Sequence, residues 1–306
     1  GRLLRNREKY DVIIAHVPPS LFTFWLFLFK GDTRLVVLVA DLQSVHMGHG
    51  SGFLRKWVFS AIGYIERLTF NCADHLIFMS GAMLNKIGRL NIKQKINVDV
   101  CYPGVTIEKN NDAKTDVLDF ISHDKINIVY SGALGQKQNP SFLYSLFDAV
   151  SKLKTNYCCY ILSEGDSFEH IKNMGAVEES KVIFGSLVDE SQVTELYAKS
   201  FIQVVPQKPG TSDGSLPSKV PNLISNFVPI FSMTDEGGDL ANLLDDYPLG
   251  RHSQSLTVSL VAEQLSVFSE DLIKRQNLTD AEKDIIEAML DEKFSFDRFI
   301  NLLHVE

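Results

Sequence analysis

Short apolar runs alternate with longer amphipathic segments along most of the chain. The runs are rich in Val, Ile, Leu and Phe, which is typical of strands buried on both faces of a parallel sheet. The segments between them have helical spacing. The pattern predicts an α/β protein with doubly wound parallel sheets and right-handed crossovers. The expected strands cover residues 12–15, 35–40, 76–79, 98–102, 126–130, 157–162, 182–184, 201–205 and 228–232.

A polar stretch separates the first four predicted strands from the rest. It follows Pro103-Gly104, is rich in Asn, Asp and Lys, and ends near Asp116. Such a stretch is typical of an interdomain connection. We therefore expect two Rossmann-like domains, residues 1–104 and residues 105–306, the second ending in helices. The first domain has no glycine-rich turn after its first strand, and we expect it to be incomplete, with one or two strands missing before residue 1.

Two strand-to-helix loops of the second domain carry both glycine and lysine. One follows the first strand of this domain and contains Gly132, Gly135 and Lys137. The other begins after Val205 and ends at Lys219, in the first turn of the next helix. Ligands bind at the carboxyl ends of parallel strands, where glycines let the backbone approach a phosphate and lysine supplies positive charge. We predict that the two loops clamp one diphosphate.

Composition and charge argue against several classes of protein, beginning with nucleic-acid-binding proteins. The chain has 306 residues and a formal net charge of −8, which argues against nucleic acid, because a phosphate backbone is held by clustered Lys and Arg. The longest apolar stretch, 21–29, is shorter than the roughly twenty residues of a membrane-spanning helix, and no signal peptide is visible. The four cysteines lack zinc-ligand spacing, so we expect reduced thiols in a cytosolic protein.

A series of short motifs runs through the chain in a fixed order. They are YDVIIAH at 10–16, VADL at 39–42, YIERL at 64–68, ADHLI at 73–77, YPGV at 102–105, YSGALGQKQ at 130–138, VPQ at 205–207 and LPSK at 216–219. This set resembles the GT-B glycosyltransferases, specifically the retaining family 4 and its bacterial branch that builds exopolysaccharides of the colanic-acid type.

The resemblance implies a function and a set of site residues. The C-terminal domain would hold a nucleotide-diphosphate sugar and the N-terminal domain would face a saccharide or lipid-linked acceptor, without a metal or other cofactor, in the cytoplasm at the inner face of the cell membrane. The catalytic candidates are Lys137, Lys219, Asp213 and His46, and the donor-binding candidates are Gly132, Gly135, Gly185, Ser186, Leu187, Gln207, Ser218 and Asn222. The acceptor-side candidates are His16 and Asp41.

Two positions depart from the family pattern. Family members commonly carry an acidic pair eight residues apart, of which the second acid holds the ribose, and this chain has Gly214 and Asn222 there. Asp213 precedes the first position, and Asn222 can still hydrogen-bond a hydroxyl. A catalytically silent GT-B-like subunit that supports an active transferase is therefore the second hypothesis. A GT-B epimerase is the third, although we identify no pair of carboxylates for its acid–base chemistry.

Alternative interpretations exist at several positions. Surface exposure is the default for lysines such as Lys137. His46 and His49 are three residues apart, but the glycines around them predict a loop and not a metal site. The glycines at 132–135 lack the three-glycine fingerprint of NAD-binding turns. The helix expected at 53–68 is either a core-packing amphipathic helix or a basic, aromatic element that rests on a membrane.

Overall fold

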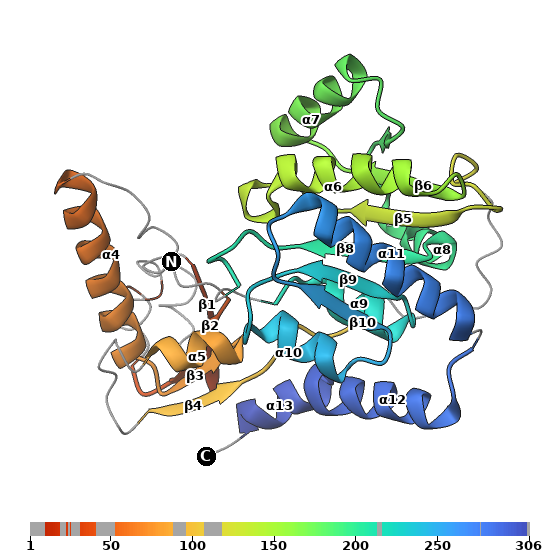
Figure 1. Ribbon diagram of the computed structural model, residues 1–306. Coiled ribbons are helices and arrows are strands. Elements are labelled where there is room, and N and C mark those ends of the chain that lie inside the picture. The colour runs from red at the N-terminus through yellow and green to blue at the C-terminus, as the bar shows by residue number, and fades with distance from the viewer. Residues whose placement is uncertain are drawn as a thin grey trace. The chain divides into compact units, whose positions relative to one another are not determined.

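The computed structural model divides into two compact units, which are described separately below (Figure 1). The first unit comprises Gly1–Gly104, Asp213–Leu216 and Lys293–Glu306, and the second comprises Val105–Ser212 and Pro217–Glu292. The sequence analysis assigned the chain after residue 292 to the second domain, whereas the structure groups it with the first. The structure describes residues 10–18, 23, 25, 31–40, 53–87, 96–106, 118–212, 216–275 and 277–304.

The first unit contains a four-stranded parallel sheet. The strands are β1 (Val12–Val17), β2 (Arg34–Val39), β3 (His75–Phe78) and β4 (Asn97–Val100), in that spatial order. Two helices, α4 (Phe53–Asn71) and α5 (Gly81–Ile87), precede and follow β3. The strands alternate with helices as the apolar pattern predicts, and their inward side chains form a buried cluster with residues of both helices.

The last helix, α13 (Phe296–His304), packs on the first sheet and explains the assignment of the chain end to that unit. Phe299, Leu302 and Leu303 lie against buried Val36 and Ile77 of β2 and β3. Side-chain hydrogen bonds also connect this helix to the amino ends of β2 and β3. Arg34 donates from Nη1 to the Leu303 carbonyl at 2.9 Å, and its Nη2 lies 3.1 Å from Nδ1 of buried His75.

The second unit contains a six-stranded sheet in which every pair of neighbours is parallel. Its spatial order is β10-β9-β8-β5-β6-β7. The strands are β5 (Ile126–Ser131), β6 (Tyr157–Leu162), β7 (Ile183–Gly185), β8 (Ile202–Pro206), β9 (Ile230–Met233) and β10 (Gly250–Ser253). The sequence analysis missed β10, because its four residues, Gly-Arg-His-Ser, carry no apolar run.

Helices cover both faces of this sheet. Apolar residues of α6 (Pro140–Leu153) and α11 (Val258–Arg275) share one buried cluster with alternate residues of β5, β6, β8 and β9. Leu196 of α8 (Val193–Lys199) packs on the opposite face with Val129 and Tyr160. The remaining elements are α7 (Asp166–Val177), α9 (Lys219–Ser225), α10 (Asp239–Asp246), α12 (Asp280–Phe294) and the 3₁₀ turns η3 (Gln136–Gln138) and η4 (Glu190–Gln192).

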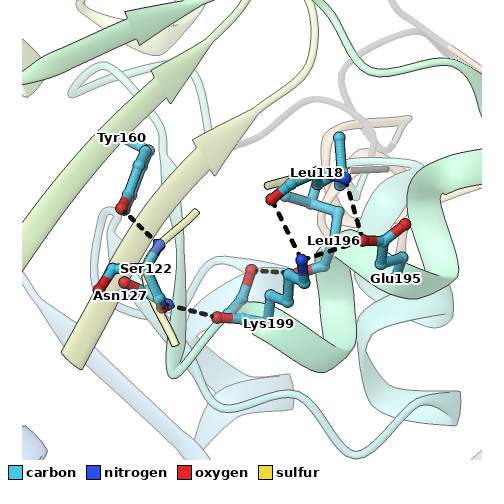
Figure 2. A network of polar contacts seen from close by, with 8 residues as sticks. Leu118, Ser122, Asn127, Tyr160, Glu195, Leu196 and Lys199 are labelled. Carbon is cyan, nitrogen blue, oxygen red and sulfur yellow. Dashed lines mark hydrogen bonds and ion pairs between the residues drawn. The ribbon is translucent and has the colours of Figure 1, made fainter. Parts of the chain in front are cut away.

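A polar network fastens the segment before β5 to α8 (Figure 2). Glu195 and Lys199 form an ion pair at 3.1 Å, in which Glu195 is buried and the Lys199 side chain is 13% exposed. The Leu118 amide donates to Glu195 Oε1 at 3.0 Å, and Lys199 Nζ donates to the Leu118 carbonyl at 3.1 Å. The Ser122 amide donates to the Tyr160 hydroxyl at 3.0 Å. The chain entering β5 is therefore held by satisfied, partly charged hydrogen bonds.

Candidate functional site

The second sheet has a topological switch point between β5 and β8. From β5 the chain continues to β6 and β7 on one side, and from β8 it continues to β9 and β10 on the other. Counted within this unit, the order is the 3-2-1-4-5-6 arrangement of doubly wound nucleotide-binding sheets. Ligands of such sheets bind at the carboxyl ends of the strands, at the switch point. Both glycine–lysine loops predicted from sequence begin there.

The structure brings these two loops into direct contact. The Lys208 amide, in the loop after β8, donates to the Lys137 carbonyl, in the loop after β5, at 2.7 Å. Lys219, the first residue of α9, donates from Nζ to the carbonyl of Ser131, the last residue of β5, at 3.0 Å. The two lysines that we selected from sequence therefore belong to one cluster of loops around the switch point.

Gly132 provides the turn by which the chain leaves β5. Its φ of 127° lies in the region that favours glycine, and a Cβ built there meets no atom of the described residues within 4 Å. Its amide donates to the Leu162 carbonyl at 3.1 Å, and Ser163 Oγ donates to its carbonyl at 2.7 Å. Gly135 is extended, and its amide donates to Gln138 Oε1 at 2.9 Å.

Lys219 is held among neutral groups. Its ammonium lies 4.4 Å from the centroid of the Tyr130 ring, on the strand that also supplies the Ser131 carbonyl. The residue as a whole is half-buried and its ammonium lies deep, and this burial lowers the pKa of Lys219 from 10.5 to about 7. The sequence predicts a positive charge at Lys219, whereas burial of the amine disfavours that charge near neutral pH.

Asp235 anchors the loop after β8, and the sequence analysis did not select it. Its Oδ2 accepts from the Gly210 amide at 2.8 Å and from Ser212 Oγ at 2.6 Å. Next to it, Thr234 donates to Gln207 Oε1 at 2.6 Å. A signal for Asp235 was available, because an acidic residue shortly after a predicted strand lies at the carboxyl edge of a parallel sheet.

Asn222 makes contacts that differ from the expectation of a hydroxyl ligand. Its buried amide group holds Thr106, near the start of the second unit. The Thr106 amide donates to Asn222 Oδ1 at 2.8 Å, and Asn222 Nδ2 donates to Thr106 Oγ1 at 3.0 Å. Asn222 lies one helical turn after Lys219, so α9 joins a site lysine to the segment that enters the second unit.

The other selected residues are placed as follows. Lys137 is exposed on η3, Ser218 is exposed before α9, and Gln207 is half-buried after β8. Gly185 ends β7, two strands from β5, and is followed by exposed Ser186 and Leu187. His16 is exposed on β1 of the first unit. Asp41, His46 and Asp213 lie outside the described residues.

The described part of the chain offers neither a metal-ligand cluster nor a membrane-spanning helix. No group of three or more His, Cys, Asp or Glu side chains there is arranged to hold a metal ion. None of the helices described has the length and apolar character needed to cross a membrane. All four cysteines are described, and none of them is in a disulfide.

Comparison with known proteins identifies the fold. No family model and no curated protein matches the chain. It is similar to sucrose-phosphate synthase from Thermosynechococcus elongatus, with a TM-score of 0.75 and 13% identity over 99% of this chain and 74% of that one. It is also similar to Anabaena Alr3699/HepE in complex with UDP and glucose, with a TM-score of 0.70 and 14% identity over 100% of this chain and 80% of that one.

A third similar structure is the E. coli trehalose-6-phosphate structure bound with UDP-2-fluoro glucose. Its TM-score is 0.71 and its identity is 11%, over 100% of this chain and 76% of that one. At these identities the similarity establishes the fold alone. The chain has the GT-B fold, with two Rossmann-like α/β units, as the sequence analysis predicts.

Proposed function

We propose that the chain is a retaining glycosyltransferase that moves a sugar from a nucleotide-diphosphate donor to a saccharide or lipid-linked acceptor. The observation that carries this proposal is that two glycine–lysine loops meet at the switch point of the second sheet. There the Lys208 amide donates to the Lys137 carbonyl, and Lys219 Nζ donates to the carbonyl of Ser131 at the end of β5. Solved structures of the same fold hold UDP with glucose or a UDP-glucose analogue.

The chemistry we assign to this site is stabilisation of a leaving diphosphate. In the transfer, the bond from the anomeric carbon to the diphosphate oxygen breaks while the acceptor oxygen bonds to the same face of the sugar. The acceptor proton passes to an oxygen of the departing diphosphate. Lys137 and Lys219 would offset the negative charge that develops on the diphosphate, which is the role of fixed cations in such sites. With two lysines in this role, we propose a metal-independent reaction.

The finer assignment rests on the order of the sequence motifs. The pair YSGALGQKQ at 130–138 and LPSK at 216–219 supports placement in the retaining family 4, in its branch that builds exopolysaccharides of the colanic-acid type. We accordingly propose transfer of a hexose during the assembly of a bacterial surface polysaccharide. We place the reaction in the cytoplasm, at the inner face of the cell membrane, where a lipid-linked acceptor would be available.

Substitution of the two lysines tests the proposed function. We expect Lys137→Ala and Lys219→Ala each to lower transfer at least tenfold, because each removes a cation that stabilises the leaving group, by analogy with the loss of a single transition-state donor. Lys283→Ala is the matched control, since this lysine pairs with Asp280 on the surface of α12. Circular dichroism checks the fold of each variant. Unchanged turnover in both site variants would place the chemistry elsewhere.

A catalytically silent subunit is the second candidate function, and one observation favours it. Where the resembled family has its second acid, this chain has Asn222, whose amide group is bonded to Thr106. A protein of this kind would bind nucleotide, show no turnover, and form a stable complex with an active transferase. Turnover by the purified chain alone would exclude this candidate.

A further inference from the structure

Lys219 carries an amine whose charge is poorly supported by its surroundings. Its described polar contacts are the Ser131 carbonyl at 3.0 Å and the face of the Tyr130 ring at 4.4 Å, and both groups are neutral. Tyr130 donates its own hydroxyl to the Ala133 carbonyl at 2.7 Å, and burial raises the pKa of this phenol, so it stays uncharged. Within the described part of the chain, no carboxylate forms an ion pair with Lys219.

The position of this amine matters because it lies at the carboxyl end of β5, at the switch point of the sheet. Lys219 Nζ bonds the carbonyl of Ser131, and a Cβ built on the next residue, Gly132, would meet no atom of the described residues within 4 Å. Ligands of such sheets bind at this edge, so a diphosphate bound there would lie near the end of the strand that the amine contacts. A neutral amine has two N–H groups and a lone pair, and one N–H already serves Ser131. The ammonium form has a third N–H and can serve both the carbonyl and the phosphate.

We propose that binding of a nucleoside diphosphate at the switch point takes up one proton from the solvent, and that Lys219 Nζ receives it. This inference rests on the proposed function, because it assumes that the diphosphate lies at this site. The proton comes from the buffer acid, and no bond between heavy atoms changes. The burial that disfavours the ammonium is offset when an anion arrives, since an opposite charge nearby favours the charged form.

The pH range of the effect follows from the two protonation states. Burial lowers the pKa of Lys219 to about 7, and the bound diphosphate raises it again. Uptake is therefore small below about pH 6, where the lysine is already charged, and approaches one proton near pH 8.5. Among the described residues, the titratable groups on the strands and loops that meet at this edge include Tyr130 on β5, Lys137 and Lys208 on the two loops, and Asp235, which bonds the loop after β8. Asp213 lies outside the described residues.

Isothermal titration calorimetry measures the proton directly. UDP is titrated into the protein at pH 8.5 in buffers with different enthalpies of ionisation, and the slope of the observed binding enthalpy against buffer enthalpy gives the number of protons. The phosphates of UDP contribute none at this pH, because a terminal phosphate ionises near about pH 6. We expect uptake of about one proton, and a fall in affinity of up to about tenfold per pH unit between pH 8 and 9.5.

Three variants assign the proton to a residue. Lys219→Arg should bind UDP without proton uptake, because guanidinium stays charged throughout this range. Lys219→Met should lose both the uptake and most of the affinity, and Lys283→Ala should behave as the wild type. Uptake that persists in Lys219→Arg would overturn the assignment and point to another group, such as Asp213. The wild-type titration needs no variant, so a misfolded variant does not prevent the test.

The outcomes separate this inference from the proposed function. If wild-type protein binds UDP, GDP or ADP with no proton uptake at pH 8.5, the inference made here is wrong and the donor site stands. If none of these nucleotides binds in any buffer at any pH tested, both the donor site and the proton uptake are wrong.

Discussion

At the scale of single residues, Lys219 combines two demands that oppose each other. A buried ammonium costs stability, and a fixed cation near a diphosphate is useful for binding and catalysis. Its described contacts, a carbonyl and an aromatic ring, offset only part of the burial cost. A residue that lowers the stability of the fold at neutral pH is expected where function requires it.

Replacement of Lys219 by methionine tests this balance. The unfolded lysine has a pKa near 10.5 and the folded one about 7, so between these values the unfolded chain binds more protons and wild-type stability rises with pH. We expect Lys219→Met to be more stable than wild type at pH 7, by about 1 to 3 kcal/mol, and to lack this rise. Urea unfolding followed by circular dichroism between pH 6 and 9.5 measures both effects.

The control for this prediction is Lys283→Met, which should follow the wild-type pH dependence because Lys283 lies on the surface of α12. A Lys219→Met variant whose stability runs parallel to that of the wild type across this range would show that Lys219 is not buried as described.

At the scale of elements, the polar network of Figure 2 fixes the start of the second sheet. Glu195 is the central residue, because it accepts from Leu118 and pairs with Lys199. We expect Glu195→Ala to destabilise the protein by about 2 to 3 kcal/mol, since it removes the acceptor of the Leu118 amide and the ion-pair partner of Lys199, which keeps its bond to the Leu118 carbonyl. Thermal or urea unfolding measures the loss.

An exposed glutamate of the same unit, Glu190, is the control, and Glu190→Ala should change stability by less than about 0.5 kcal/mol. The double variant Glu195→Leu with Lys199→Met should recover much of the loss, because it removes both charges together. Equal stability of Glu195→Ala and wild type would contradict the account of this network.

The strands and helices also show which parts of the fold could be predicted from the sequence. The nine predicted strands are present, because buried parallel strands are almost continuously apolar and their pattern is unambiguous. α6 begins at Pro140, a residue type favoured in the first turn of a helix, although Asn139 before it adopts a left-handed conformation and its side chain does not cap the helix. β10 could not be predicted, because a short polar edge strand is defined by its pairing with β9 and not by its own residues.

The candidate site was predictable in outline for a similar physical reason. Parallel sheets bring the carboxyl ends of strands together, so loops carrying Lys137 and Lys219 were expected to meet. The sequence could not show that Lys219 turns toward Tyr130 or that Asn222 binds Thr106, since these contacts depend on side chains far apart in the chain. Asp235 was not predicted because the loop after β8 was selected by its own glycine and lysine residues, whereas Asp235 follows β9 and holds that loop by hydrogen bonds.

At the scale of the whole molecule, the GT-B fold provides two Rossmann-like units whose sheets differ in their number of strands. The first has a four-stranded sheet that also carries the last helix, and the second has a six-stranded sheet with a switch point. The residues that we assign to the donor lie in the second unit, and the acceptor-side candidate His16 lies in the first. The central claim is therefore specific: a nucleoside diphosphate binds at the switch point between β5 and β8.

A thermal-shift screen in the presence of EDTA tests that claim most directly. UDP, GDP, ADP, CMP and their common sugar conjugates are added to the wild-type protein and to Lys137→Ala, because a ligand that binds only the folded state raises the melting temperature. We predict a selective rise with one nucleoside diphosphate and its sugar conjugate, reduced in the variant. No rise with any of these ligands, or an equal rise in Lys137→Ala, would contradict a metal-free donor site at the switch point.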